Sequence, residues 1–128
     1  MPLATSQLQP AHPLIVLTKR HDFLAAGKFG KKGVAASVIL QAHAHGKDLP
    51  PRYGITASKK IGNAVTRNRA KRRLRHLAQQ ELSPQAKPGV DYVFIARHNT
   101  AQVSWPQLVG DFAKAMHRIN KNPDQASS

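Results

Sequence analysis

The sequence contains no cysteine and no long apolar run, and both absences limit what the protein can be. Without cysteine the chain forms neither disulfide bonds nor thiolate zinc sites, which fits a reducing compartment. No stretch approaches the roughly 18 consecutive apolar residues that a membrane-spanning helix needs. Residues 1–13 contain no basic segment of the kind that begins a secretion signal. We therefore expect a cytoplasmic protein that is not embedded in a membrane.

Acidic residues are also scarce. The chain has only six of them, which are Asp22, Asp48, Glu81, Asp91, Asp111 and Asp124. No two form the close pair along the chain that would indicate a two-metal nuclease. His43 and His45 alternate on a predicted strand, and without further ligands nearby we favour a solvent-facing pair over a metal site. Because no nucleophile stands beside a general base either, we predict no catalytic residue, no protein-bound metal and no small-molecule substrate.

Basic residues, by contrast, are abundant. Lys and Arg together number 20 of 128 residues, which gives a formal charge of +14 and a pI near 11.1. A compact chain with this charge repels itself unless a polyanion neutralises it. Nucleic acid is the first candidate partner, because binding to phosphates releases condensed counterions. An anionic membrane surface is the second, and a merely solvated charged surface is the reading that so high a pI disfavours.

Apolar periodicity predicts helices that alternate with short strands. We expect helices over residues 19–26, residues 63–81 and residues 104–119, and strands over residues 37–44, 53–58 and 92–97, with a basic turn at 28–33 and a linker at 83–89. The third strand is apolar almost throughout, as a central strand would be, and the short link between the first two strands predicts that they pair antiparallel. The order predicts an α/β sandwich, with a small mixed sheet of three to four strands and about three helices. Residues 1–13 are expected to form a flexible arm, 14–120 a single domain and 121–128 a polar tail.

The most informative stretch is residues 59–75, KKIGNAVTRNRAKRRLR, which holds eight of the 20 basic residues in 17 positions and no acid. On a helix, one face would be apolar and would consist of Ala70, Leu74, Leu77 and Ala78. The opposite, polar face would consist of Asn68, Arg69, Arg72, Arg75 and His76. Because a solvated face usually mixes both signs of charge, this crowding of cations favours polyanion binding. The pattern alone leaves DNA, RNA and the ribosome open as partners.

Several short motifs also follow one another in a definite order. They are Lys59-Lys60, Gly62-Asn63-Ala64-Val65, Arg67-Asn68-Arg69, Lys71-Arg72, Arg75 and, on the third strand, Ile95-Ala96-Arg97. Together with the opening at residues 17–23, they resemble the signature of the bacterial ribonuclease P protein component. A lone Arg-Asn-Arg is unspecific, but the complete run of residues 58–75 is highly specific. The resemblance covers about residues 17–119.

This resemblance implies a protein that assists a catalytic RNA in removing the 5′ leader from precursor tRNA. The RNA subunit and its bound Mg²⁺ would perform the hydrolysis, so the protein alone would not be catalytic. The implied RNA-binding residues are Lys59, Lys60, Asn63, Arg67, Asn68, Arg69, Lys71, Arg72 and Arg75. The leader would lie in a cleft between the first helix and the sheet, lined by Phe23, Leu40, Thr56 and Ser58. Such a cleft has a physical rationale, because unpaired bases pack on aromatic and apolar groups.

Two points qualify the resemblance. The family often has a second aromatic residue one turn after Phe23, where this chain has Gly27 and then Phe29, so we expect a reshaped cleft. The family also implies a left-handed crossover through the basic helix, against the general right-handed rule. From the residues alone, Phe23 is as well explained by core packing, and the whole chain also fits a structural RNA-binding protein of the ribosome or a protein-only nuclease.

Overall fold

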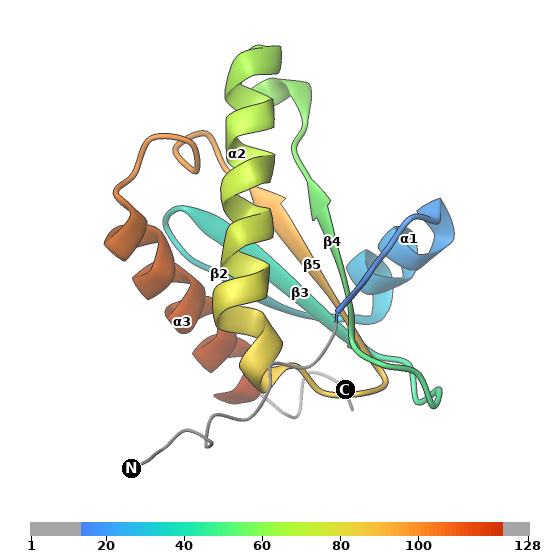
Figure 1. Ribbon diagram of the computed structural model, residues 1–128. Coiled ribbons are helices and arrows are strands. Elements are labelled where there is room, and N and C mark those ends of the chain that lie inside the picture. Colours follow the sequence, from blue (N-terminus) through green and yellow to red (C-terminus); the bar gives the residue numbers. More distant parts are fainter. Residues whose placement is uncertain (1–13, 122–128) are drawn as a thin grey trace.

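The computed structural model describes residues 14–121, and Figure 1 shows their arrangement. The strands are β1 (Ile15–Val16), β2 (Lys31–Val34), β3 (Val38–Ala44), β4 (Arg52–Thr56) and β5 (Val90–Ala96). The helices are α1 (Arg20–Phe29), α2 (Ala64–Leu77) and α3 (Trp105–Lys121). A 3₁₀ turn, Lys59–Ile61, precedes α2, and a π-helical turn (Ala78–Leu82) and a second 3₁₀ turn (Ser83–Gln85) follow it. The predicted arm and the tail beyond residue 121 lie outside the described residues, while Lys121 ends α3.

The five strands form one mixed sheet in the order β1-β4-β5-β3-β2. β5 pairs parallel with β4 and antiparallel with β3, while β1 and β2 form the two edges. The α/β class and the central position of β5 are therefore confirmed, but the sheet has five strands instead of the predicted three to four, and the predicted direct pairing of β3 with β4 is wrong. Because β5 is buried on both faces, its insertion between the two strands removes more apolar surface from water than a simple hairpin would. The left-handed sense of the β4–α2–β5 crossover stays a prediction.

The segment between α1 and β3 differs from the prediction. The first helix continues through Gly27 to Phe29, and residues 31–34 form the edge strand β2 instead of a turn. Gly33 explains the strand, because a Cβ at this position would clash with the backbone carbonyl of Ala115. Helix α3 thus crosses β2 in backbone contact, and this long-range contact holds a strand whose own side chains show no strand periodicity.

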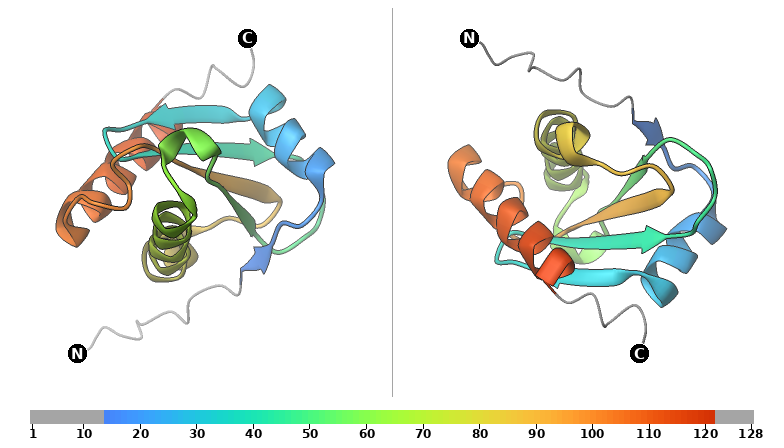
Figure 2. Two further views of the ribbon diagram at one scale, coloured as in Figure 1. Left: turned by 90° about the horizontal axis from the view of Figure 1, so that it is seen from above. Right: turned by 90° about the horizontal axis from the view of Figure 1, so that it is seen from below.

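Helices cover both faces of the sheet (Figure 2). Helices α2 and α3 cover one face and enclose the main core, where Phe94 of β5 stacks on Phe112 of α3 with ring centroids 5.8 Å apart. Tyr53 of β4 meets Phe94 edge-on at 6.4 Å. The shorter α1 packs over β3 and β5 on the other face, where Leu17 and Ala26 belong to a small second cluster.

Helix α2 is built as its sequence predicts. Its N-cap is confirmed, since the side-chain oxygen of Asn63 accepts a hydrogen bond from the backbone N–H of Thr66 at 2.9 Å. Its apolar stripe is confirmed as well. The four stripe residues, each 0% exposed, are Ala70, Leu74, Leu77 and Ala78. The predicted cap of α3 is also present, because the Ser104 hydroxyl accepts from the N–H of Gln107 at 3.2 Å.

Candidate nucleic-acid interface

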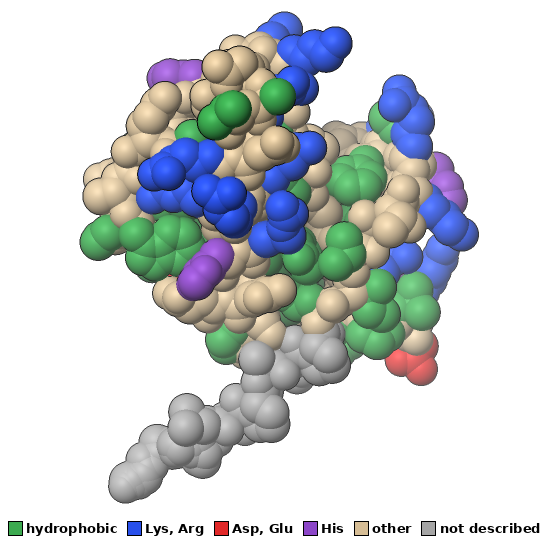
Figure 3. Space-filling model, turned by 45° about the horizontal axis from the view of Figure 1, so that its top comes forward, with side chains coloured by type: hydrophobic (Ala, Val, Ile, Leu, Met, Phe, Trp, Pro, Cys, Tyr) green, Lys and Arg blue, Asp and Glu red, His purple; other side chains and the backbone are tan. Residues whose placement is uncertain are grey.

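The outer side of α2 carries a dense group of cations, which Figure 3 shows as blue side chains over the helix and beyond its N-terminal end. We call this group the basic surface. Its members are Lys59, Lys60, Arg67, Lys71, Arg72 and Arg75, and their side chains have neither a hydrogen-bond nor an ion-pair partner among residues 14–121. All six were predicted from the sequence as RNA-binding residues. Asn68, also predicted, lies exposed among them, and Asn63 is occupied as the helix cap.

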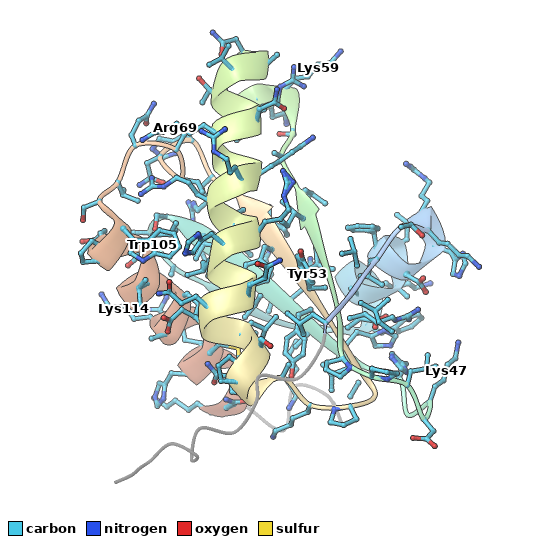
Figure 4. All side chains as sticks on the ribbon, in the orientation of Figure 1. Lys47, Tyr53, Lys59, Arg69, Trp105 and Lys114 are labelled. Carbon is cyan, nitrogen blue, oxygen red and sulfur yellow. The ribbon has the colours of Figure 1, made fainter. Side chains whose placement is uncertain are left out.

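Two further arginines of α2 have a different role. Arg73 donates to the carbonyl oxygens of Thr100 and Val103 at 2.8 and 2.6 Å. Arg69 donates through Nε to the carbonyl of Ala101 at 2.7 Å. Burial, and then the neighbouring charge of Arg69, lower the pKa of Arg73 below its ordinary value. These two guanidinium groups hold the loop between β5 and α3 against α2, as Figure 4 shows for Arg69.

The opposite flank of α2 faces β4 and α1. Spacing of four residues places Arg67, Lys71 and Arg75 on this flank. The Nε atom of Arg67 is buried without a hydrogen-bond partner. Lys71 and Arg75 line a hollow of about 220 Å³ whose other wall includes Phe23 and Ile55. The structure thus brings the predicted aromatic residue of the cleft together with two predicted cations, a proximity that sequence spacing does not reveal.

The predicted cleft residues divide into two groups. Phe23 packs, half-buried, across Gly54 and joins the small cluster under α1, while Thr56 and Ser58 are exposed at and just beyond the end of β4. Leu40 does not line a cleft, because it is 0% exposed and belongs to the main core on the opposite face of the sheet. Since side chains alternate along a strand, the neighbours of Leu40 in β3, not Leu40 itself, face α1.

At the far end of the α1 face, Asp91 is the centre of a buried polar cluster. Arg52 grips both of its carboxylate oxygens, each at 2.7 Å, and these hydrogen bonds raise the pKa of Arg52 above its ordinary value. His45 lies with Nε2 3.3 Å from Asp91 and its side chain is 7% exposed. His43 pairs in register with Asp91 and has a buried Nδ1 without a partner. The predicted solvent-facing pair is therefore wrong for His45, which is largely buried because α1 covers this end of the sheet, while His43 is partly exposed.

No group of three or more His, Cys, Asp or Glu side chains among residues 14–121 is placed to hold a metal ion. Among the helices of this range, none combines the length and the apolar character required to cross a bilayer.

The fold and the basic surface define a class of small, strongly basic α/β proteins built around one cationic helix. The family model for Ribonuclease P matches residues 13–120. The ribonuclease P protein component of Caulobacter vibrioides is 42% identical over 112 residues, which are 88% of this chain and 75% of that protein. That of Ruegeria pomeroyi is 44% identical over 108 residues, 82% of this chain and 86% of that one.

Solved structures agree with the sequence comparison. The ribonuclease P protein of Staphylococcus aureus has a TM-score of 0.65 at 25% identity, covering 79% of this chain and 91% of that one. The protein of Thermotoga maritima has a TM-score of 0.64 at 27% identity, covering 76% and 90%. The chain belongs to the bacterial ribonuclease P protein family. Its context is therefore a ribonucleoprotein endonuclease of tRNA processing.

Proposed function

We propose that this protein binds the catalytic RNA of ribonuclease P through the basic surface and holds the 5′ leader of precursor tRNA beside Phe23. The observation that carries the proposal is the set of six unpartnered cations on and before α2. Like charges at this density repel one another until a polyanion neutralises them. Phosphate binding relieves this repulsion and releases counterions from the RNA.

The hollow beside Phe23 suits a single strand. An unpaired base can pack on the aromatic ring, while Lys71 and Arg75 on the facing wall bind the phosphates that connect one base to the next. Thr56 and Ser58, exposed at the end of β4, extend this surface with hydroxyl groups. Gly27 has no side chain, and a Cβ there would already lie 3.7 Å from the amide nitrogen of Gln41, so the leader has more room at this position than a second aromatic residue would allow.

In this proposal the protein supplies binding and the RNA subunit supplies the reaction. The RNA with its bound Mg²⁺ performs hydrolysis, and the protein contributes no catalytic residue. The cations of the protein reduce the repulsion between two RNA molecules, so the complex needs less Mg²⁺ than the RNA alone. We also propose that the protein acts in the cytoplasm, where its RNA partners are made.

Reconstitution tests the proposal. The purified chain is added to a bacterial ribonuclease P RNA and a precursor tRNA, and cleavage is measured at low and high Mg²⁺. We expect strong stimulation at low Mg²⁺, little at high Mg²⁺ and no cleavage without the RNA subunit. The absence of stimulation at low Mg²⁺ would refute the proposal, and metal-dependent cleavage by the RNA-free protein would support a protein-only nuclease instead.

A second experiment tests the leader site. Phe23→Ala should weaken binding of precursor tRNA by roughly 1–3 kcal/mol, the range for one base–aromatic contact, and leave the binding of leaderless tRNA unchanged. Leu24→Ala is the matched control, because Leu24 lies next on α1 but is 57% exposed and does not line the hollow. An equal loss for both substrates would show that Phe23 is needed only for packing.

A further inference from the structure

A second hollow lies on the other flank of α2, against the start of α3. It has a volume of about 370 Å³ and is lined by Arg72, Arg73, His76 and Trp105. Trp105 is the only tryptophan of the chain, and Figure 4 shows it between the two helices. The volume lies within the roughly 300–1,000 Å³ typical of small-ligand sites. Its lining holds three basic side chains and one large aromatic ring, with no carboxylate.

The ring of Trp105 is held in place by its surroundings. It is half-buried, and one side packs against the main core. The loop just before it is fixed to α2 by Arg73, which donates to the carbonyls of Thr100 and Val103. The ring of His76 meets the indole edge-to-face, with centroids 5.0 Å apart. A ring held in this way loses little conformational freedom when it binds a flat partner, so the site is preorganised.

The groups that a ligand would use are still available. Arg72 is exposed and has no hydrogen-bond or ion-pair partner among residues 14–121. Within that range, the one cation–π contact is between Lys28 and Phe29, so no lysine or arginine lies over the ring of Trp105. Charge complementarity selects an anionic occupant, and the indole selects one with a flat apolar part. A nucleotide has both properties, and it must be unpaired because bases in a duplex are already stacked on their neighbours.

We propose that this hollow binds one unpaired nucleotide of the RNA partner, with its base stacked on Trp105 and its phosphate held by Arg72. The inference rests on the proposed function, because it assumes that the basic surface faces RNA. It adds that both flanks of α2 bind RNA. On one flank, α2 lines the hollow beside Phe23 that holds the leader. On the other flank, α2 and Trp105 line the hollow that binds an unpaired base of the RNA subunit.

The lone tryptophan provides a direct readout. The full-length protein is titrated with a bacterial ribonuclease P RNA while its intrinsic fluorescence is followed, and binding is measured separately by filter retention. We expect saturable quenching at the same RNA concentrations as binding. A short single-stranded oligoribonucleotide should quench as well, and a fully paired RNA duplex should not.

Variants separate stacking from charge. Trp105→Ala should weaken binding of the RNA subunit by roughly 5- to 150-fold, the equivalent of one base–aromatic stack, without changing the slope of binding against salt. Trp105→Phe should restore most of this loss, while Arg72→Ala should reduce the salt slope by about one. Phe29→Ala is the control for removing an exposed aromatic elsewhere, since Phe29 is 64% exposed on α1.

The outcomes distinguish this inference from the proposed function. If the wild-type protein does not bind the RNA subunit, both fail. If it binds with a steep salt dependence but without quenching, or if duplex RNA quenches equally, the stacking site is refuted while the basic surface stands. Should Trp105→Ala unfold, the wild-type fluorescence titration and Trp105→Phe still decide the question.

Discussion

Adjacent arginines of α2 should respond to substitution in opposite ways. Arg72 is exposed without a partner, whereas Arg73 makes two hydrogen bonds to the loop between β5 and α3. Arg73→Ala should therefore destabilise the fold, and Arg72→Ala should weaken RNA binding with little effect on stability. The two positions have the same residue type and lie next to each other, so each variant is the control for the other.

The magnitude follows from the two bonds that Arg73 makes. A hydrogen bond to a charged group contributes about 1.5–3 kcal/mol when buried, and Arg73 is only partly buried. Its removal also leaves the carbonyls of Thr100 and Val103 without their donor. We expect Arg73→Ala to lower the free energy of unfolding by about 2–4 kcal/mol. Arg73→Lys should recover little of this, because an ammonium group cannot bridge two carbonyls as the planar fork does.

Urea denaturation followed by circular dichroism measures the first effect, and filter binding to the RNA subunit from low to high salt measures the second. Arg72→Ala should keep the wild-type midpoint in urea and reduce the salt slope by about one. Arg73 does not hold the loop if Arg73→Ala keeps the wild-type stability and loses as much of the salt slope as Arg72→Ala. In that case both arginines would face the RNA.

Three further predictions concern the scaffold. Leu74→Ala, in the fully buried stripe of α2, should cost about 2–5 kcal/mol in urea denaturation and leave the salt slope of the folded protein unchanged. Gly33→Ala should destabilise the fold by about 3 kcal/mol, because the new methyl group meets the backbone of α3. Gly110→Ala is the control, since Gly110 has open space around it, and should stabilise the fold by up to about 1 kcal/mol. Equal effects of the two substitutions on the urea midpoint would contradict the crossing of α3 over β2. Burial alone would raise the pKa of Asp111, but hydrogen bonds from Ser37 and Gln107 and the charge of Lys114 outweigh it and lower the pKa. The ionised carboxylate of Asp111 therefore stabilises the fold above the ordinary carboxyl pKa of about 4, and this stabilisation is lost as pH falls through the lower folded-state value. Asp111→Asn should flatten the dependence of the urea midpoint on pH in this range.

Local sequence patterns were sufficient to predict where α2 begins and which of its faces is buried. The apolar spacing of Leu74 and Leu77 predicted the buried side of α2, and Asn63 predicted where the helix begins; both are confirmed. A helix buries one stripe wherever it packs, so its inner and outer faces follow from the order of residues within about four turns. The same logic placed Arg72 and Arg75 of the basic surface on the outer face, where both are exposed.

Contacts between segments far apart in the chain decided the strand order, the position of Leu40 and the role of Arg73. The order of strands depends on β5, which joins the sheet from beyond α2, and the face of Leu40 depends on which helices cover that side of the sheet. The bonds of Arg73 depend on a loop some 30 residues later in the chain. Residue order specifies which side chains share a face of one helix or strand, but the free energy that selects neighbours among such faces comes from surfaces that meet only when the chain has folded.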